Sequence, residues 1–307
     1  MQNGLIFSIL VVLLIGCASS PESHDEYGDK EFSFVFMTDI HLRPELRATD
    51  GFQMAIDSVN ALKPDFVITG GDLVSDVLGS TYERADTLYK LYNKMAAGFT
   101  MPVYNTMGNH EFFGYFTIPK VDPGHPEYGE KMFENRIGKP YYSFNHKGWH
   151  FMILDGTEKV GEDWSDLIGK VDVEQMQWIR EDLATIDSGK PIVVTIHIPL
   201  VSIIPQINNG PLYGGNQSYL VTNQQEVLAL FRNMNLKLVL QGHLHALEDL
   251  NLMGKTHFLT GGAICGRGWK TPDDSEFQEG FVKIDVKGDD FTWEYVDYGW
   301  ETGIVSQ

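Results

Sequence analysis

The sequence predicts an α/β fold whose central strands are mostly parallel, and two observations support this prediction. Unbroken apolar runs of strand length alternate with longer segments whose apolar residues recur at helical spacing. The strongest apolar runs are each followed by a short cluster of Gly, Asp, Asn or His. Because ligands bind at the carboxyl ends of the strands in open α/β sheets, these clusters predict a single site at that edge.

The first half of the chain predicts three strands separated by two helices. Residues 32–37 (FSFVFM) are an apolar run of strand length, and residues 48–63 place their apolar side chains at helical spacing. Two further strands are expected at 65–72 (DFVITGGD) and 102–107 (PVYNTM), with a helix around 80–97 between them. Strands joined by helices in this way favour parallel pairing, because a parallel connection has to cross over the sheet.

The second half repeats this pattern less regularly. Its strongest strand is LVLQ (238–241), which stops at Gly242. An excursion at 199–222, which contains several Gly and Asn residues, separates a strand from a helix and is of the kind that borders active sites. The other expected elements are a hairpin turning at Lys147 and Gly148, a helix over 172–187, a strand over 191–199, a helix over 223–234 and two antiparallel tail strands joined at 288–290.

Length and charge limit what the chain can be. Its 307 residues are 43% hydrophobic and 21% charged, which is ordinary for a globular protein, and no linker interrupts residues 32–307, so we expect one domain there. The formal net charge of −19 disfavours general affinity for nucleic acids or anionic lipids. An anionic substrate would therefore need a local reversal of the field, which bound metal ions provide.

The amino terminus predicts export and lipid anchoring. Residues 4–16 (GLIFSILVVLLIG) are too short to span a bilayer comfortably but suit the core of a signal peptide. The run ends in LIGC, which resembles the lipobox of bacterial lipoproteins, where the cysteine, here Cys17, becomes the acylated first residue. We therefore expect a signal peptide at 1–16, then a lipidated amino terminus and flexible tether at 17–31.

A protein processed in this way is an exported bacterial lipoprotein, anchored in a membrane through Cys17 on its periplasmic or cell-surface side. A retained membrane anchor is the competing interpretation, because no Lys or Arg precedes the apolar run. Once Cys17 is lipidated, the other cysteine, Cys265, has no partner, so no disulfide framework is expected.

Metal-binding residue types follow the strongest strands. One pair, His243 and His245, would share a face if strand geometry continued past Gly242, although a lone His-x-His also fits solvated loop residues. The candidate metal-binding residues at all these strand ends have only oxygen and nitrogen donors, which suits Mn, Fe or Zn and argues against a structural zinc site built from cysteines. This set exceeds the ligands of one ion and predicts two divalent ions roughly 3.5–4 Å apart, sharing a carboxylate and a solvent molecule. The set is Asp39, His41, Asp72, Asn109, His110, His197, His243 and His245.

The ordered series DIH, GGD, GNHE, the histidine of IHIP, and GHLH resembles the calcineurin-like metallophosphoesterase superfamily and spans residues 39–245. The resemblance implies a two-sheet αββα sandwich flanked by helices. It also implies two ligand sets that share Asp72 as a bridge. The first ion would be held by Asp39, His41, Asp72 and His245, and the second by Asp72, Asn109, His197 and His243.

Other residues of these motifs also receive roles. By the same resemblance, His110 would sit outside the metal shells near the leaving-group oxygen, as proton donor or charge stabiliser. Glu111 could orient the His110 ring, or could be a surface residue. Gly71 and Gly108 would let the backbone turn sharply at strand ends. The chain has Ser75 where purple acid phosphatases have a tyrosine ligand, and its DIH motif is closer to the phosphodiesterase-like and broad phosphatase branches.

The expected reaction is hydrolysis of a small phosphomonoester or phosphodiester. Two dications would neutralise the phosphoryl group and lower the pKa of a bridging water, so that hydroxide can attack in line. Cleavage of a diphosphate linkage stays open within this class, and no nucleic acid polymer is expected as a partner. The alternative from another class is a non-catalytic metal-binding or ligand-binding lipoprotein that retains the fold.

Selectivity residues are less clearly indicated. Arg267, in CGRGW, is a candidate for gripping a second phosphate of the substrate. Aromatic residues in EFFGYF (111–116) could stack on a base or aryl group, although packing under a loop explains them more simply.

Overall fold

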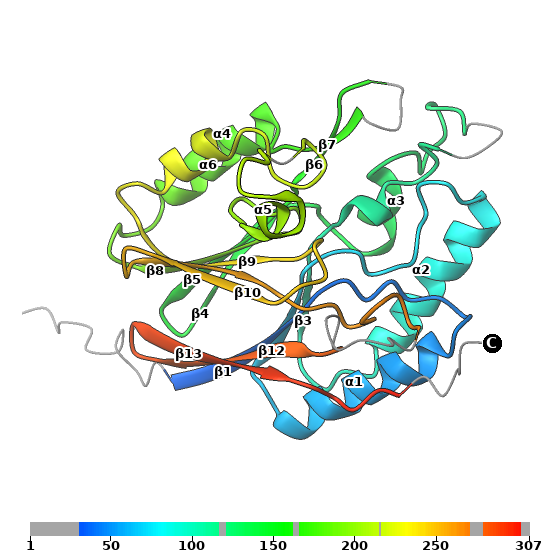
Figure 1. The fold of residues 1–307 in the computed structure, drawn as a ribbon, viewed down its shortest axis with the longest axis horizontal. Coiled ribbons are helices and arrows are strands. Elements are labelled where there is room, and N and C mark those ends of the chain that lie inside the picture. Colours follow the sequence, from blue (N-terminus) through cyan, green and yellow to red (C-terminus); the bar gives the residue numbers. More distant parts are fainter. Residues whose placement is uncertain (1–30, 117–120, 162–165, 215, 271–278, 302–307) are drawn as a thin grey trace, which may run out of the picture.

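Two β-sheets pack face to face at the centre of the fold, and helices cover their outer faces (Figure 1). The computed structural model describes residues 31–116, 121–161, 166–214, 216–270 and 279–301. The expected α/β sandwich of two sheets flanked by helices is confirmed. The expected signal peptide, the acylated Cys17 and residues 18–30 of the tether lie outside the described residues. None of the helices in the described ranges has the length and apolar character needed to cross a membrane.

The first sheet carries the amino-terminal half of the site. Its strands are β1 (Glu31–Met37), β2 (Phe66–Thr69), β3 (Val103–Asn105), β12 (Phe281–Lys287) and β13 (Asp290–Val296). Their spatial order is β13-β12-β1-β2-β3, with parallel pairing from β1 to β3 and antiparallel pairing elsewhere. Helices α1 (Ala48–Leu62) and α2 (Tyr82–Ala96) pack on its outer face.

The second sheet carries the rest of the site. Its strands are β4 (Tyr142–His146), β5 (Trp149–Leu154), β8 (Pro191–Ile196), β9 (Asn235–Gln241), β10 (Glu248–Leu252) and β11 (Thr256–Thr260). Their order is β10-β11-β9-β8-β5-β4, in which the four inner strands are parallel and the two outer strands antiparallel to their neighbours. Helices α4 (Val173–Leu183) and α6 (Gln224–Leu230) cover it.

The strands and helices expected from the sequence are present, including the hairpin at Lys147 and Gly148, where His146 lies opposite Trp149. The structure adds short elements that the sequence pattern did not predict, together with the β10–β11 hairpin. Each is too short to show a hydrophobic period. The additional elements are η1 (Asn109–Glu111), α3 (Lys131–Arg136), β6 (Thr157–Lys159), β7 (Leu167–Gly169) and α5 (Ile204–Asn209), the last within the 199–222 excursion.

The core between the sheets is aromatic. Side chains of β1 alternate between two faces, so that Phe34 and Phe36 meet the other sheet whereas Val35 and Met37 pack toward the helices. The Phe34 ring lies edge-on to Phe151 of β5, with 5.5 Å between ring centroids. This packing fixes the two sheets relative to each other and therefore also the distance between their carboxyl edges.

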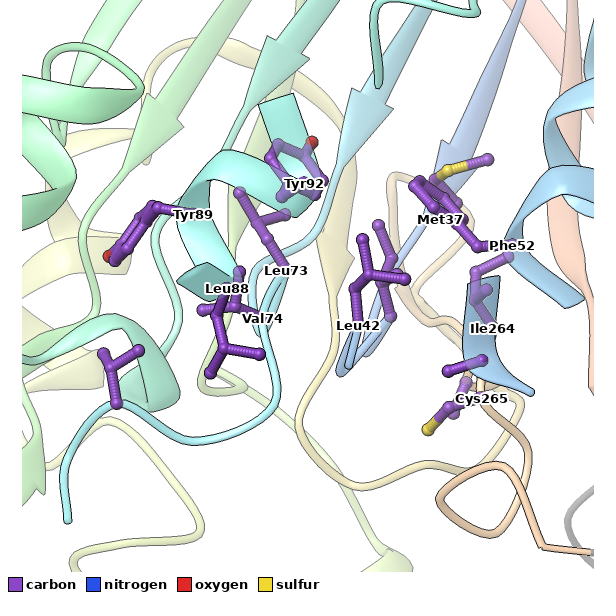
Figure 2. Packing of buried hydrophobic residues seen from close by; sticks show 14 of the residues in the cluster. Met37, Leu42, Phe52, Leu73, Val74, Leu88, Tyr89, Tyr92, Ile264 and Cys265 are labelled. Carbon is purple, nitrogen blue, oxygen red and sulfur yellow. The ribbon is translucent and has the colours of Figure 1, made fainter. Parts of the chain in front are cut away.

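A second apolar cluster lies beneath the loops that follow β1 and β2 (Figure 2). Leu42 and Val74 come from these two loops and form an isolated parallel bridge. Phe52 of α1, Leu88 of α2 and Ile264 pack in the same cluster, and all five residues are at most 1% exposed. The loops that carry the first candidate ligands are thus anchored by buried side chains.

Candidate metal centre

The seven predicted metal-binding residues lie together at the carboxyl ends of parallel strands. Four of them follow β1, β2 and β3 in the first sheet, and three follow β8 and β9 in the second sheet. The expected convergence is therefore present, but it joins the edges of two sheets rather than lying along one. The four are Asp39, His41, Asp72 and Asn109, and the three are His197, His243 and His245.

The first predicted ligand set is brought within coordination range. His41 Nε2 lies 3.0 Å from His245 Nε2 and 3.5 Å from Asp72 Oδ2. Asp39 Oδ1 lies 3.2 Å from His245 Nε2 and 3.9 Å from His41 Nε2. Two ligands that each lie about 2.1 Å from one ion are separated by about 3.0–3.4 Å. The separations of His245 from His41 and from Asp39 lie in this range, and the separations of His41 from Asp72 and from Asp39 are wider.

The second predicted set shares an oxygen with the first. His197 Nε2 lies 3.2 Å from Asp72 Oδ2 and 3.1 Å from Asn109 Oδ1. A nitrogen of His243 lies within 4.8 Å of the donor atoms of Asp72 and His197. Because Asp72 Oδ2 faces both His41 and His197, it occupies the position that a bridging ligand requires.

Three histidines are oriented by backbone carbonyl groups. His197 Nδ1 pairs with the carbonyl oxygen of Gly70 at 2.7 Å, and His243 Nε2 with that of Ser218 at 2.8 Å. His245 Nδ1 is 3.4 Å from the carbonyl oxygen of Gly266. A ring nitrogen that donates to a carbonyl leaves the other nitrogen with its lone pair, which is how metal-binding imidazoles are held.

The electrostatics of the centre favour a bound cation. Burial would raise the pKa of Asp72 and of Asp39, but the neighbouring histidines lower both values below the usual range. Burial would lower the pKa of His197 and of His245, but Asp72 raises the first to about 9 and Asp39 raises the second to about 12. Burial lowers the pKa of His41 to about 3, which keeps this ring neutral and able to bind metal. Buried, ionised carboxylates among imidazoles need a positive partner, whether a proton or a metal ion.

Most of the ligands sit on strained backbone. The φ angles of Asp39, His41, Asp72, His243 and His245 are 54°, 44°, 52°, 71° and 52°. Side-chain-bearing residues rarely adopt this left-handed region, and each such residue costs of the order of 1–3 kcal/mol unless its surroundings impose it. β9 ends at Gln241, so strand geometry does not continue past Gly242, which was the condition for His243 and His245 to share a strand face. The two histidines, both partly exposed residues of the loop after β9, nevertheless reach the centre, each beside donors of a different predicted ligand set.

Glu111 neither orients the His110 ring nor lies on the surface, which were the two expectations for it. It is fully buried rather than on the surface, and its carboxylate accepts backbone N–H groups of Asp72 (2.9 Å), Val74 (3.1 Å) and Gly108 (2.7 Å) rather than orienting the His110 ring. Burial raises its pKa to about 8, with a further contribution from the Asp72 carboxylate. Glu111 therefore ties the loops that carry Asp72 and Asn109 to each other.

The two glycines of these motifs serve different purposes. Gly71 has a φ of +94°, as the expected sharp turn requires, and a Cβ there would lie 2.5 Å from His197 Nδ1. Gly108 has a φ of −110°, which any residue adopts, so the prediction of a sharp turn at this position is wrong. The reason for glycine here is space, because a Cβ would lie 2.3 Å from both the backbone nitrogen and Oδ1 of Asp72.

His110 lies at the rim of the centre. Its backbone N–H donates to Asp72 Oδ1 at 3.0 Å, and its Nε2 lies 3.8 Å from Asp72 Oδ2. Its ring meets that of His41 edge-on with 4.7 Å between centroids. The side chain is 30% exposed, so a molecule bound at the centre can reach it.

Two neighbours of the centre follow β11. Cys265 is buried, and its Sγ lies within 4.8 Å of a donor atom of His41 and of His245, although sequence analysis expected no thiol near the ligands. Cys265 follows β11, and β11 runs parallel to β9, so Cys265 comes to the same edge of the sheet as His243 and His245. Its position after an expected strand would have been the sequence signal for this placement. Arg267 is exposed and follows Gly266, whose carbonyl faces His245. Its contact with a substrate remains a prediction.

Comparisons with known proteins agree with this architecture. Residues 32–247 match the family model of the calcineurin-like phosphoesterases. No curated protein has a significantly similar sequence. A dimetal phosphatase from Danio rerio is similar in structure, with a TM-score of 0.63 and 13% sequence identity over 87% of this chain and 96% of that one.

A second solved structure, GAP50, described as the anchor in the inner membrane complex of Plasmodium, has a TM-score of 0.53 and 13% identity over 87% of this chain and 85% of that one. At these identities both structures show a common fold alone. The family match, by contrast, covers most of the sequence and contains all seven predicted metal-binding residues. The chain therefore belongs to the calcineurin-like phosphoesterases, a family of metal-dependent enzymes that act on phosphate esters.

Proposed function

We propose that the chain is a dinuclear-metal phosphoesterase that hydrolyses small phosphomonoesters or phosphodiesters. One observation carries this proposal. Asp72 Oδ2 lies 3.5 Å from His41 Nε2 and 3.2 Å from His197 Nε2, so that two ligand sets meet at one carboxylate oxygen. A single ion would leave part of this donor set without a role.

The residues of the centre have distinct tasks in this reaction. When bound, divalent ions neutralise phosphoryl charge and acidify a water molecule. The two carboxylates, the amide oxygen of Asn109 and the imidazoles would hold these ions, and the donor set is compatible with Mn, Fe or Zn. His110 Nε2, at the open rim, donates a proton to the oxygen of the departing group. Backbone carbonyls and Glu111 keep the ligands oriented for this chemistry.

We propose in addition that the enzyme is exported and anchored by lipid at Cys17. The apolar run at 4–16 and the LIGC sequence support this location. Expression of the full chain in a bacterial host should give a membrane-bound, acylated protein when intact mass is measured. The Cys17→Ala variant should lack the acyl mass. An unmodified full-length protein in the membrane would instead support a retained membrane anchor.

The alternative is a metal-binding lipoprotein without turnover. It is kept because one protein of the same fold is described as an anchor. His110 favours the enzyme, because a chain that only binds metal would keep the ligands but has no reason to keep a histidine outside the two ligand sets at the rim of the centre.

Hydrolysis assays on the full chain in detergent test the enzyme directly. With Mn²⁺ supplied, we expect turnover of p-nitrophenyl phosphate, bis(p-nitrophenyl) phosphate or both, and a loss of about a thousandfold in kcat for Asp72→Asn. Asp57→Asn is the matched control, because Asp57 is an exposed carboxylate of α1. Absence of turnover with Mn²⁺, Fe²⁺ and Zn²⁺, when calorimetry confirms that metal is bound, would favour the non-catalytic alternative.

A further inference from the structure

A pocket of about 620 Å³ lies directly beside the candidate metal centre. Asn109 and His243, both members of the second ligand set, form part of its wall. Pockets that bind small molecules usually measure about 300–1,000 Å³, so this space is large enough for an organic group attached to a phosphate. A phosphoryl group at the centre would therefore have its substituent next to this pocket.

The walls of the pocket are mainly apolar. Among its lining residues that the structure describes, none is Lys, Arg, Asp or Glu. This composition contrasts with the metal centre, where buried carboxylates and imidazoles gather. The apolar lining residues are Leu78, Phe116, Leu167, Ile198 and Tyr219.

Residues 216–218 contribute polar atoms to the pocket wall, and the side-chain oxygen of Asn216 already accepts hydrogen bonds within this loop. Asn216 Oδ1 accepts the backbone N–H of Ser218 at 2.8 Å and of Tyr219 at 3.1 Å, as well as the Ser218 hydroxyl at 2.6 Å. The carbonyl oxygen of Ser218 in turn holds His243. This loop thus fixes a metal ligand and the pocket wall together, and the side-chain oxygen of Asn216 is occupied within the loop.

Cationic groups are expected where a second phosphate binds, because burying an anion without a partner is costly. Arg267 does not supply one here, since it follows Gly266 beside His245, in the other ligand set, and is not part of the pocket wall. The described walls of the pocket therefore suit an uncharged group better than a nucleoside diphosphate or another doubly phosphorylated molecule.

We propose that this pocket binds the organic group of the substrate and selects phosphate esters whose organic group is uncharged and largely apolar, either aryl or alkyl. This inference rests on the proposed function for the identity of the reaction. The predicted preference for uncharged, apolar ligands depends only on the composition of the pocket wall. Binding therefore tests it independently of turnover.

Phosphonates are suitable probes because each carries one organic group on phosphorus and is not hydrolysed. Their dissociation constants can be measured by calorimetry on the Mn²⁺-loaded full chain. Phenylphosphonate and hexylphosphonate should each bind about tenfold more tightly than methylphosphonate, and 4-carboxyphenylphosphonate about tenfold more weakly than phenylphosphonate. The ratio of the phenyl to the hexyl value distinguishes an aryl-binding pocket from an alkyl-binding one.

Substitutions of Tyr219 locate the preference in the pocket. Tyr219 is 40% exposed, so replacing it should leave the fold intact. Tyr219→Ala should weaken phenylphosphonate binding with little effect on methylphosphonate, and Tyr219→Lys should make the carboxyphenyl compound the tighter aryl ligand. Leu212→Ala is the control, because Leu212 is 98% exposed in the same segment and outside the pocket wall.

The outcomes separate the two proposals. Equal affinities for methyl-, phenyl- and hexylphosphonate, or tighter binding of the carboxyphenyl compound to the wild type, would overturn the pocket assignment even if phosphate esters are hydrolysed. The predicted order of affinities without hydrolysis of any ester would support the pocket assignment and remove the proposed enzyme function.

Discussion

The core between the sheets and the loops at their carboxyl edge differ in polarity and in backbone conformation. In the core, strand side chains alternate between faces, and the rings of Phe34 and Phe151 pack edge-on within an apolar cluster with 5.5 Å between their centroids. At the edge, ligands such as Asp39 and Asp72 are buried charges on left-handed backbone. The first region supplies stability, and the second region draws on it to hold a strained and charged arrangement in place.

Substitutions in the core should change stability without changing the chemistry. Phe34→Ala removes a fully buried ring and should lower the free energy of unfolding by about 4 kcal/mol, through lost burial and the cavity that remains. Urea denaturation measures this loss, and calorimetry at a temperature where the variant is folded should give an unchanged Mn²⁺ affinity. Phe34→Leu is the control and should cost clearly less. A large loss of Mn²⁺ affinity in the folded variant would break the separation between the two regions.

Glu111 connects the two regions and should affect both. Glu111→Gln replaces a carboxylate that accepts three backbone N–H groups by an amide with one acceptor oxygen. We expect a loss of about 2 kcal/mol in unfolding free energy, because one oxygen can still accept from Asp72 and Gly108 but the amide NH₂ group would face the buried N–H of Val74, which loses its partner. Mn²⁺ affinity should also fall about tenfold, since the two facing N–H groups repel and shift the loop that carries Asp72.

The control for this variant is Glu45→Gln, which removes an exposed carboxylate paired with Arg84. It should change neither quantity measurably. Lower stability with unchanged Mn²⁺ affinity in Glu111→Gln would show that Glu111 supports the fold without positioning the ligands.

The same comparison explains what could be predicted from the sequence. The period-two pattern of β1 and the helical pattern of α1 are local signals, so the core elements were predictable. The residues that converge at the carboxyl edge were predictable for a similar reason, because short motifs such as GNHE follow strand ends. The carbonyl of Ser218 that holds His243 was not predictable, because it depends on a contact across 25 residues.

Two other features could not be predicted, because they also depend on contacts between distant parts of the chain. The left-handed torsions of Asp72 and His245 are imposed by surrounding loops and leave no trace in the residue types. Cys265 reaches the centre only because β11 lies parallel to β9, a pairing that the chain pattern did not indicate.

The smallest expected effect concerns Glu130, a partly buried carboxylate in an acidic neighbourhood that belongs to neither predicted ligand set. Burial, with Asp172, Glu134 and Glu158 nearby, raises its pKa from 4.5 to about 7. Between these values the unfolded chain releases a proton that the folded chain keeps, so folded-state stability falls as pH rises through this window. Glu130→Gln should therefore match the wild type at pH 4 and exceed it by about 1 kcal/mol at pH 8, after allowance for partial exposure. Urea denaturation across this range measures the difference, and a difference that does not vary with pH would show that Glu130 ionises normally in the folded protein. A pH-dependent difference would show that a charge buried outside the metal centre also costs stability, with no function to explain it.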